Sequence, residues 1–275
     1  MMKVIYAKNI WEEGKKIYKR DIINGKFDCD IYLNNIKFSD DIKMNKENNI
    51  YIILKKDYDD LSYMFYTCGS LTSIVFYNYN TTNIKDMRFM FCGCHSLKSL
   101  NLSKFNCDNV TNTSYMFYDC SSLISLDLPK FNKNNLVDSS YMFYNCRSLA
   151  SINLANFSTD NILSMRCMFC NCASLTLIDL SSFNTNNVDN MSFMFYGCKS
   201  LIAINLSNFN PYNILDMSHM FSLCNSLISI DLSNCIIENE TKLSNMFDDC
   251  NSLSFVRISN FSHDKIKSLI KCIIK

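Results

Sequence analysis

The stretch Met116-Phe117-Tyr118-Asp119-Cys120-Ser121-Ser122-Leu123 is one of eight copies of the pattern Met-Phe-x-x-Cys-x-Ser-Leu in this chain. The first copy begins at Met64 and the last at Met246, and each begins 26 residues after the one before it. A fixed period of this length is typical of a solenoid, in which each repeat packs only against its neighbours. The period therefore predicts the architecture of most of the chain.

Each repeat is predicted to contain a short helix and then a strand. In one repeat Met87, Met90, Phe91 and Cys94 recur at intervals that place them on one face of a helix. The predicted helix N-caps are Asp60, Asp86, Asn112, Asp138, Ser164, Asn190 and Asp216. The Leu-x-x-Leu-x-Leu pattern that follows alternates like a strand. The predicted fold class is an α/β, leucine-rich-repeat-type solenoid with a parallel sheet on one side, short helices on the other and caps at both ends.

The chain divides into three predicted parts. Residues 1–57 lie outside the period and contain two or three short apolar runs, which predict a β-rich N-terminal cap. Residues 58–261 hold the repeats. Residues 262–275 are predicted to form a C-terminal capping helix, with Ser262 as its N-cap and Ile266, Leu269, Ile270 and Ile273 on its apolar face.

The repeats resemble those of the BspA-like leucine-rich repeat family, in its 26-residue "surface protein" form, over about three quarters of the chain. The shared features are the Met-Phe-x-x-Cys-x-Ser-Leu core, a Leu-x-Leu strand and an Asn-Val or Asn-Ile turn. The resemblance implies a right-handed solenoid and a non-enzymatic role such as adhesion or protein binding. It also implies a cell-surface or secreted location for many members.

Charge and targeting signals suggest a different location. The first twenty residues lack the apolar core of a signal peptide, and no run is long enough to cross a membrane. We therefore expect a cytoplasmic protein with reduced cysteines, and keep the cell surface or a secreted state as the alternative. Between residues 58 and 261 there are 16 acidic and 11 basic residues, which argues against nucleic acid as a partner.

Eight cysteines recur at the same position of the repeat and are predicted to form a buried structural ladder. They are Cys68, Cys94, Cys120, Cys146, Cys172, Cys198, Cys224 and Cys250. Their parallel stacking does not provide the converging ligands of a metal site, so no metal or cofactor is expected. Cys167 and Cys170 add a Cys-x-x-Cys-x-Cys run with Cys172, for which substitution within the repeat is the main interpretation and a metal or redox site the alternative.

Two further ladders are polar. Serines recur from Ser70 to Ser252 and asparagines from Asn83 to Asn239, both at the repeat spacing. We expect their side chains to bond to backbone groups in tight turns; a ligand-binding stripe is the alternative.

The predicted binding site is the outward stripe of the sheet. Its residues are Asn101, Asp127, Asn153, Asp179, Asn205, Asp231 and Arg257. A solvated sheet face is the simplest interpretation, but solenoid faces are common recognition surfaces. The predicted function is a non-enzymatic module that binds a protein partner through such a face. The alternative is a secreted or cell-surface adhesin that recognises a host protein or a glycan.

Catalysis has little support in the sequence. The three histidines, His95, His219 and His263, occupy unrelated positions in the repeat, and the five glycines form no phosphate-binding loop. We therefore expect no enzymatic activity. Aromatic residues flank the Met-Phe pair, and they either pack between repeats or contribute to an interface.

Overall fold

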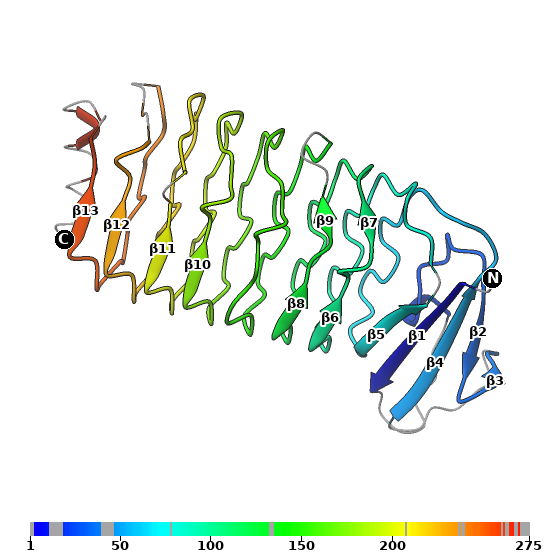
Figure 1. Cartoon of the computed structure of the whole chain (residues 1–275). Coiled ribbons are helices and arrows are strands. Elements are labelled where there is room, and N and C mark those ends of the chain that lie inside the picture. Colours follow the sequence, from blue (N-terminus) through cyan, green and yellow to red (C-terminus); the bar gives the residue numbers. More distant parts are fainter. Residues whose placement is uncertain are drawn as a thin grey trace.

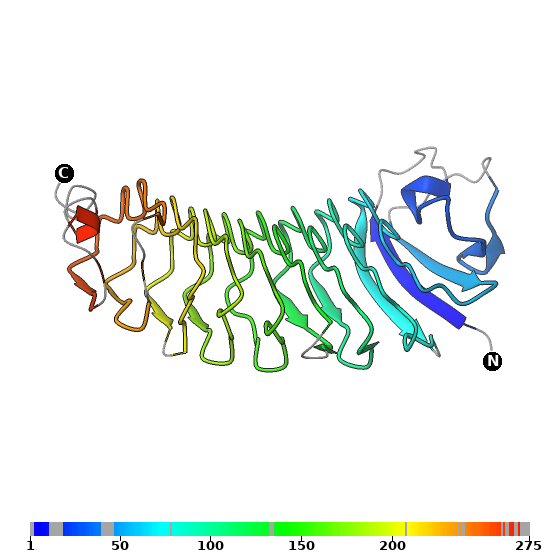
Figure 2. The same ribbon diagram turned by 90° about the horizontal axis from the view of Figure 1, so that it is seen from above.

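The computed structural model describes residues 3–10, 19–39, 47–77, 79–131, 135–206, 208–235, 237, 240–259, 261, 264–266 and 269. The repeats lie side by side in one elongated row, with a small antiparallel sheet at the N-terminal end (Figure 1). Seen from above, tightly spaced turns line one long side of the row and wider loops line the other (Figure 2). Most regular elements are strands, and the sheets within the row are parallel and small.

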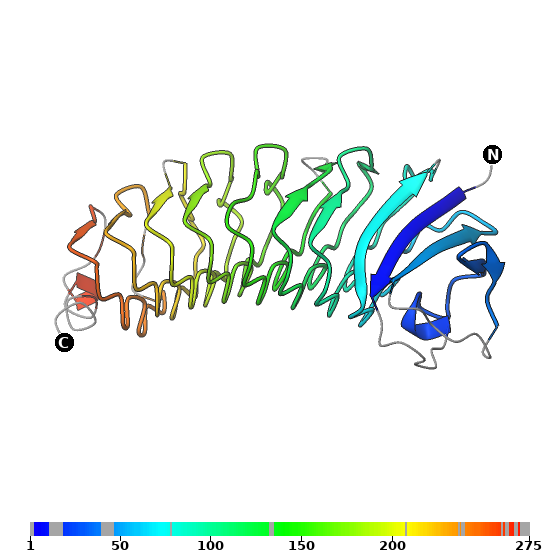
Figure 3. The same cartoon turned by 90° about the horizontal axis from the view of Figure 1, so that it is seen from below.

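The N-terminal sheet has the strand order β3-β2-β4-β1-β5. Its strands are β1 (Lys3–Ile10), β2 (Cys29–Leu33), β3 (Ile36–Lys37), β4 (Glu47–Leu54) and β5 (Leu71–Tyr77), with a short 3-10 turn, η1, at Lys19–Asp21. Strand β5 belongs to the first repeat, and β1 pairs with it antiparallel. The sheet therefore covers the first repeat by direct strand pairing, as the view from below also shows (Figure 3). The sequence analysis did not identify β1.

Short strands mark the predicted sheet side of the repeats. Their bounds are β6 Ser99–Asn101, β8 Ser125–Asp127, β10 Leu177–Asp179, β11 Ala203–Asn205, β12 Ser229–Asp231 and β13 Phe255–Arg257, together with β7 Asn106–Cys107 and β9 Lys130–Phe131 on the opposite side. They pair in parallel as β6–β8, β7–β9, β10–β11 and β12–β13. Equivalent residues of successive repeats face each other in β6–β8, β10–β11 and β12–β13, whereas in β7–β9 the partners lie 24 residues apart, as for Cys107 and Phe131. Residues 151–153, between β8 and β10, lie outside any strand.

The helix prediction for the Met-Phe stretch is wrong: each stretch is a series of turns. The amides of Met116 and Tyr118 donate to carbonyls three residues earlier, both at 3.1 Å. The amides of the intervening Tyr115 and Phe117 instead donate to Ser140 and Met142 in the next repeat, at 3.0 and 2.9 Å. An α-helix would keep all these bonds inside the segment. The apolar spacing alone could not separate the two arrangements, because both bury every third or fourth residue.

Left-handed residues interrupt any helix at two places in each repeat. Tyr115 and Asp119 have φ values of 58° and 59°, and equivalent residues in the other repeats have similar values. A right-handed helix cannot include such residues.

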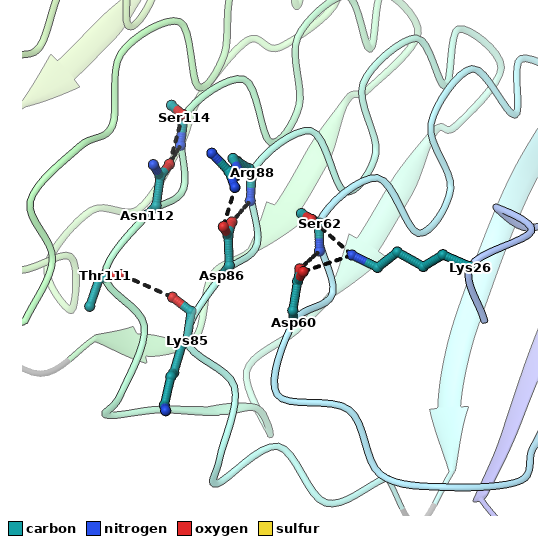
Figure 4. A network of polar contacts seen from close by, with 9 residues as sticks. All are labelled: Lys26, Asp60, Ser62, Lys85, Asp86, Arg88, Thr111, Asn112 and Ser114. Carbon is teal, nitrogen blue, oxygen red and sulfur yellow. Dashed lines mark hydrogen bonds and ion pairs between the residues drawn. The ribbon is translucent and has the colours of Figure 1, made fainter. Parts of the chain in front are cut away.

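The predicted N-caps hold turns in place of helices. The Oδ1 atoms of Asp60, Asp86 and Asn112 accept bonds from the amides two residues later, at 2.8–2.9 Å (Figure 4). The same positions are joined by parallel bridges from Asp60 through to Lys242. Their residue types thus correctly indicate capping, but of a turn.

One hydrophobic core runs through the described chain, from Ile5 in the N-terminal sheet to Leu269. The Phe that follows each Met in the repeated pattern is fully or almost fully buried and stacks on its equivalents in the neighbouring repeats. The ring centroid of Phe117 lies 5.6 Å from the centroids of both Phe91 and Phe143. At the C-terminal end, residues 264–266 and 269 are helical, and Phe261 and Leu269 are buried. Ser262, Ile270 and Ile273 of the predicted capping helix lie outside the described residues.

Candidate binding face

All seven residues of the predicted binding stripe are exposed on the sheet side of the repeats. Asn101, Asp127, Asp179, Asn205, Asp231 and Arg257 each end a short strand, and Asn153 holds the equivalent place in the repeat without a strand. The preceding residue of each repeat, from Leu100 to Val256, points into the core and is buried or half-buried. The alternation of the strands thus places the stripe as the sequence predicts; its binding role stays a prediction.

The side chains of the stripe also hold the chain where it leaves the strand. The Oδ1 atoms of Asn101, Asn153, Asp179 and Asp231 accept bonds from the amides two residues later, at 2.9–3.0 Å. At Asp179 and Asp231 the bonds from Ser181 and Ser233 hold the pKa of the carboxyl below its usual value, so both are ionised at neutral pH. The stripe is therefore a row of turn-capping groups that also presents negative charge.

An apolar patch lies beside the stripe on the later repeats, and we call it the sheet patch. Its members are Leu177, Ile202, Ala203, Ile228 and Phe255. Leu177 and Phe255 are each 59% exposed, Ile228 is 51% and Ile202 is 44% exposed. Earlier repeats have Ser99, Ser125 and Ser151 where Leu177 and Phe255 stand. Neighbouring exposed apolar side chains of this kind commonly mark interaction sites.

A shallow depression of about 460 Å³ lies at the start of the sheet patch. Its lining comprises Ile152, Leu177, Ile178, Asp179, Ala203, Ile204 and Asn205. It thus combines exposed apolar side chains with one carboxylate and one amide of the stripe. The sequence analysis followed only the polar row and missed this patch. A comparison of the one or two residues before each inward strand residue could have found it.

The aromatic residues form two stacked rows on the turn side. In the first row Tyr63, Phe89, Tyr115 and Tyr141 stack at centroid separations of 4.5–4.8 Å, and Phe193 stacks on His219 at 4.6 Å. In the second row Tyr118 stacks on Tyr144 at 4.6 Å. The rings of the first row are half-buried between repeats. Packing between repeats therefore accounts for these side chains.

The cysteine ladder is buried and hydrogen-bonded from repeat to repeat. The Sγ atom of Cys120 lies 3.1 Å from the carbonyl oxygen of Phe91 in the preceding repeat. The same bond recurs for Cys94, Cys146, Cys172, Cys198, Cys224 and Cys250 at 2.9–3.2 Å. Burial raises the pKa of Cys68 and Cys198 to about 12, and it also raises that of Cys120 well above its usual value. These thiols stay protonated at neutral pH and pack as small apolar groups.

The asparagine ladder also bonds between repeats. The Nδ2 atoms of Asn109, Asn135 and Asn187 donate to backbone carbonyls of the preceding repeat at 2.5–2.7 Å. In the serine ladder, the Oγ atom of Ser148 donates to the Ser121 carbonyl of the preceding repeat at 2.7 Å, as predicted. The ladder also bonds through its backbone, since the amides of Ser174 and Ser200 donate to the preceding repeat at 3.1 and 3.2 Å. Asn239 lies outside the described residues.

The histidines occupy separate places. The Nδ1 atom of His95 lies 3.0 Å from the carbonyl oxygen of Asp119, whereas His219 belongs to the first aromatic row; His263 lies outside the described residues. Within the described part of the chain, no three or more His, Cys, Asp or Glu side chains are grouped to hold a metal ion. The same part contains no helix long and apolar enough to cross a membrane.

The family comparison matches the repeats. The model of the family described as "Mycoplasma protein of unknown function, DUF285" matches residues 59–175 and 148–261, which together make up about three quarters of the chain. The chain belongs to this family. The DUF285 match covers every Met-Phe-x-x-Cys-x-Ser-Leu copy.

The DUF285 chain is similar to a leucine-rich cell surface protein from Faecalibacterium prausnitzii, with 17% identity and a TM-score of 0.24. The similarity covers 75% of this chain and 78% of that one. No curated protein matches significantly.

Proposed function

We propose that this DUF285 protein is a non-enzymatic, BspA-like leucine-rich repeat solenoid that binds a protein partner through the sheet patch and the adjoining acidic stripe. The observation that carries the proposal is the exposure of Leu177, Ile202, Ile228 and Phe255 on neighbouring repeats. Leu177 and Phe255 stand at an exposed strand position that is serine in most other repeats, and Ile202 and Ile228 stand at the neighbouring position, which is also an exposed isoleucine at Ile124. When such side chains are buried in an interface, the removal of their apolar surface from water favours binding.

Charge next to the patch favours a partner of a particular kind. Asp179 and Asp231 are ionised and flank the apolar residues, and Arg257 lies 3.5 Å from Asp231 at the last strand. A partner with apolar side chains and neighbouring Lys or Arg would complement this surface.

A photo-crosslinking experiment tests the binding face. Benzoylphenylalanine replaces Leu177 in one variant and Leu163 in a control. Leu163 is 50% exposed and directly precedes Ser164, one of the predicted N-cap positions, so it lies outside the sheet patch. After expression in the source organism and irradiation, we expect a discrete crosslinked species from position 177 and none from position 163. Equal crosslinking from the two positions contradicts the proposal.

Substitution then measures the contribution of the patch. With the captured partner in hand, Leu177→Ser and Phe255→Ser should each weaken binding by about 1–2 kcal/mol, or roughly 5- to 30-fold in Kd. Leu163→Ser should leave Kd unchanged. Unfolding curves of all three variants show whether any loss reflects binding or folding.

An adhesin is the second candidate. The resemblance of the repeats to those of BspA-like surface proteins favours it, and the exposed Phe255 ring on the strand that ends at Arg257, next to the strand of Asp231, offers contacts for a glycan as well as for a protein. The endogenous protein distinguishes the two functions. Its intact mass is measured after thiol alkylation under denaturing, non-reducing conditions, and intact cells are labelled with an impermeant amine reagent. Full alkylation of 15 cysteines without surface labelling supports an intracellular scaffold; glycans, disulfides or surface labelling support the adhesin.

A further inference from the structure

Both aromatic rows are interrupted in the same repeat. Cys167 stands where Tyr141 and Phe193 stand in the neighbouring repeats, and Cys170 stands where Tyr144 and Tyr196 stand. Both cysteines are nearly buried, with 5% and 3% of their surface exposed. Replacement of two large rings by two thiols leaves room beside the turn that must be filled from elsewhere.

Arg166 occupies that room. Its Nε atom donates to the hydroxyl of Tyr141 at 2.9 Å, and its Nη1 atom donates to Oγ of Ser192 at 2.9 Å. Its guanidinium carbon lies 5.5 Å from the ring centroid of Phe193. The guanidinium thus bridges the two aromatic neighbours, and its fixed positive charge acts on the Cys167 thiol.

The two thiols are close enough to react with each other. Cys170 donates its amide to the carbonyl of Cys167 at 3.2 Å, so the pair spans one β-turn. Residues at the ends of a β-turn have Cα atoms within about 7 Å, which overlaps the range that a disulfide bridges. In the two adjacent repeats the side chains at these positions lie next to each other: the ring centroids of Tyr141 and Tyr144 are 6.0 Å apart, and those of Phe193 and Tyr196 are 5.6 Å apart. Cys172, two residues later, instead donates to the Phe143 carbonyl at 3.2 Å and belongs to the structural ladder.

The surroundings activate one thiol of the pair. Hydrogen bonds from Cys170 and then from Tyr141, together with the charge of Arg166, lower the pKa of Cys167 despite its burial. The hydrogen bond with Cys167 and burial raise the pKa of Cys170. Every ladder thiol has its pKa raised by burial. Cys167 is therefore distinguished from the structural cysteines by chemistry as well as by position.

We propose that Cys167 and Cys170 form a redox-active dithiol that exchanges with disulfide substrates, with Cys167 as the attacking thiolate. Cys167 attacks one sulfur of a disulfide R–S–S–R, forms a mixed disulfide and releases one thiolate, RS⁻. Cys170 then loses its proton to solvent and attacks the Cys167 sulfur, which forms the Cys167–Cys170 disulfide and releases the second RS⁻. The substrate disulfide is reduced by two electrons, and the protein dithiol is oxidised by two. Neither step requires a metal or a bound cofactor.

Selective alkylation tests the nucleophile. Folded protein is treated with iodoacetamide at pH 7, and modification at each cysteine is followed by peptide mass spectrometry. Cys92 is the matched control because it occupies the Cys170 position of its own repeat, is 8% exposed and has Phe89 in place of a partner thiol. Burial raises the pKa of Cys92 to about 11, whereas that of Cys167 lies below 9.0.

The expected rate difference follows from these values. The greater thiolate fraction of Cys167, offset in part by the lower nucleophilicity of a less basic thiolate, gives it an advantage of about tenfold. Modification of Cys92 as fast as Cys167 overturns the proposal, because accessibility alone would then explain both rates.

Oxidation tests the pairing. Incubation with oxidised glutathione should give one disulfide between Cys167 and Cys170. Cys170→Ser should instead accumulate a glutathione adduct at Cys167, and Cys167→Ser should give neither product. Arg166→Gln should slow the first step while circular dichroism stays that of the wild type. Glutathione adducts spread over several cysteines, or a disulfide that involves the ladder, would refute a dedicated dithiol.

Discussion

Raising the pH of the reduced protein should unfold the repeats, because the buried ladder thiols can ionise only after unfolding. The seven thiols from Cys68 to Cys224 are at most 1% exposed. Burial raises the pKa values of all seven above 9.0, to about 12 for Cys68 and Cys198. A group whose pKa is raised in the folded state contributes stability that is complete below its unfolded pKa and is lost as the pH rises toward the folded value. The affected window therefore begins near pH 9.

The size of the effect follows from linkage. At pH 10 an unfolded thiol with a pKa of 9.0 is mostly ionised, and this ionisation favours unfolding by about 1.4 kcal/mol per thiol. Seven such thiols give a loss of about 10 kcal/mol, comparable to the whole free energy of unfolding of an ordinary domain. At pH 8 the loss is only about 0.1 kcal/mol per thiol. The urea midpoint should thus be nearly constant up to pH 8 and fall steeply between pH 9 and 10.

Urea unfolding followed by circular dichroism between pH 7 and 10, in a phosphine reductant and without oxygen, measures this dependence. Tyrosines also ionise near pH 10, so the double variant Cys120→Ala with Cys146→Ala is the control. It should be less stable than the wild type at pH 7, but should lose about 3 kcal/mol less between pH 8 and 10, since two of the seven thiols are absent. If the two proteins lose the same free energy over that range, the ladder thiols are not the cause.

Three further predictions concern neighbour contacts. Phe117→Ala should lower the free energy of unfolding by about 3–5 kcal/mol, and Phe247→Ala should cost less because Phe247 ends the stack; urea unfolding compares them. Asn135→Ala removes the side-chain hydrogen bond to the Asp108 carbonyl and should lower the free energy of unfolding by about 1 kcal/mol. An unchanged melting temperature would contradict a structural role for the asparagine ladder. Burial acts to raise the pKa of Asp60, but hydrogen bonds from Ser62 and Lys26 lower it overall. The ionised carboxylate therefore stabilises the folded protein, and this stabilisation is lost as the pH falls below 3.8. In an acid titration, Asp60→Asn should make the free energy of unfolding less dependent on pH in this range.

The period and the inward residues could be predicted from the sequence because burial recurs with the repeat. Strand residues such as Leu100, Leu126 and Ile178 are buried as the alternation predicts. The Phe that follows each Met is a core residue in every repeat, and the ladder cysteine is one in every repeat but the last, where Cys250 is half-buried. Burial depends mainly on side-chain polarity, and the same pattern of polar and apolar residues occurs in all eight repeats.

The helix was mispredicted because apolar spacing carries no information about backbone hydrogen-bond partners. A signal was nevertheless present: the residue before the ladder cysteine is Gly93, Asp119, Asn145, Asn171, Gly197 or Asp249 in six of the repeats, and each has positive φ. Gly, Asn and Asp are the residues that adopt this conformation most readily. The first left-handed position gives this signal only at Asn245, because it is Tyr, Phe, Cys or His in the other repeats.

The candidate binding face shows a different limit. The polar stripe was located correctly, but its bonds to the turn backbone depend on where the chain goes after the strand. The sheet patch is made by a departure from the repeat, as at Leu177 and Phe255. An analysis that searches for the recurring pattern passes over these departures, although a specific surface requires them.

The left-handed turns also explain why a single repeat cannot be stable alone. Two left-handed residues other than glycine cost about 2–4 kcal/mol in a repeat such as that of Tyr115 and Asp119. The three hydrogen bonds that the backbone amides of that turn donate to the next repeat contribute about 3 kcal/mol, and the stacking of Tyr115 on Tyr141 contributes about 1 kcal/mol. The backbone strain is present in every repeat, whether or not it has a neighbour. The hydrogen bonds and the ring stacking that offset it form only when the next repeat is present. At Cys167 the strained backbone remains but the ring is absent, and Arg166 takes over the contact between neighbours. Because Cys167 does not contribute to the stacking of the repeats, its side chain is available for another role.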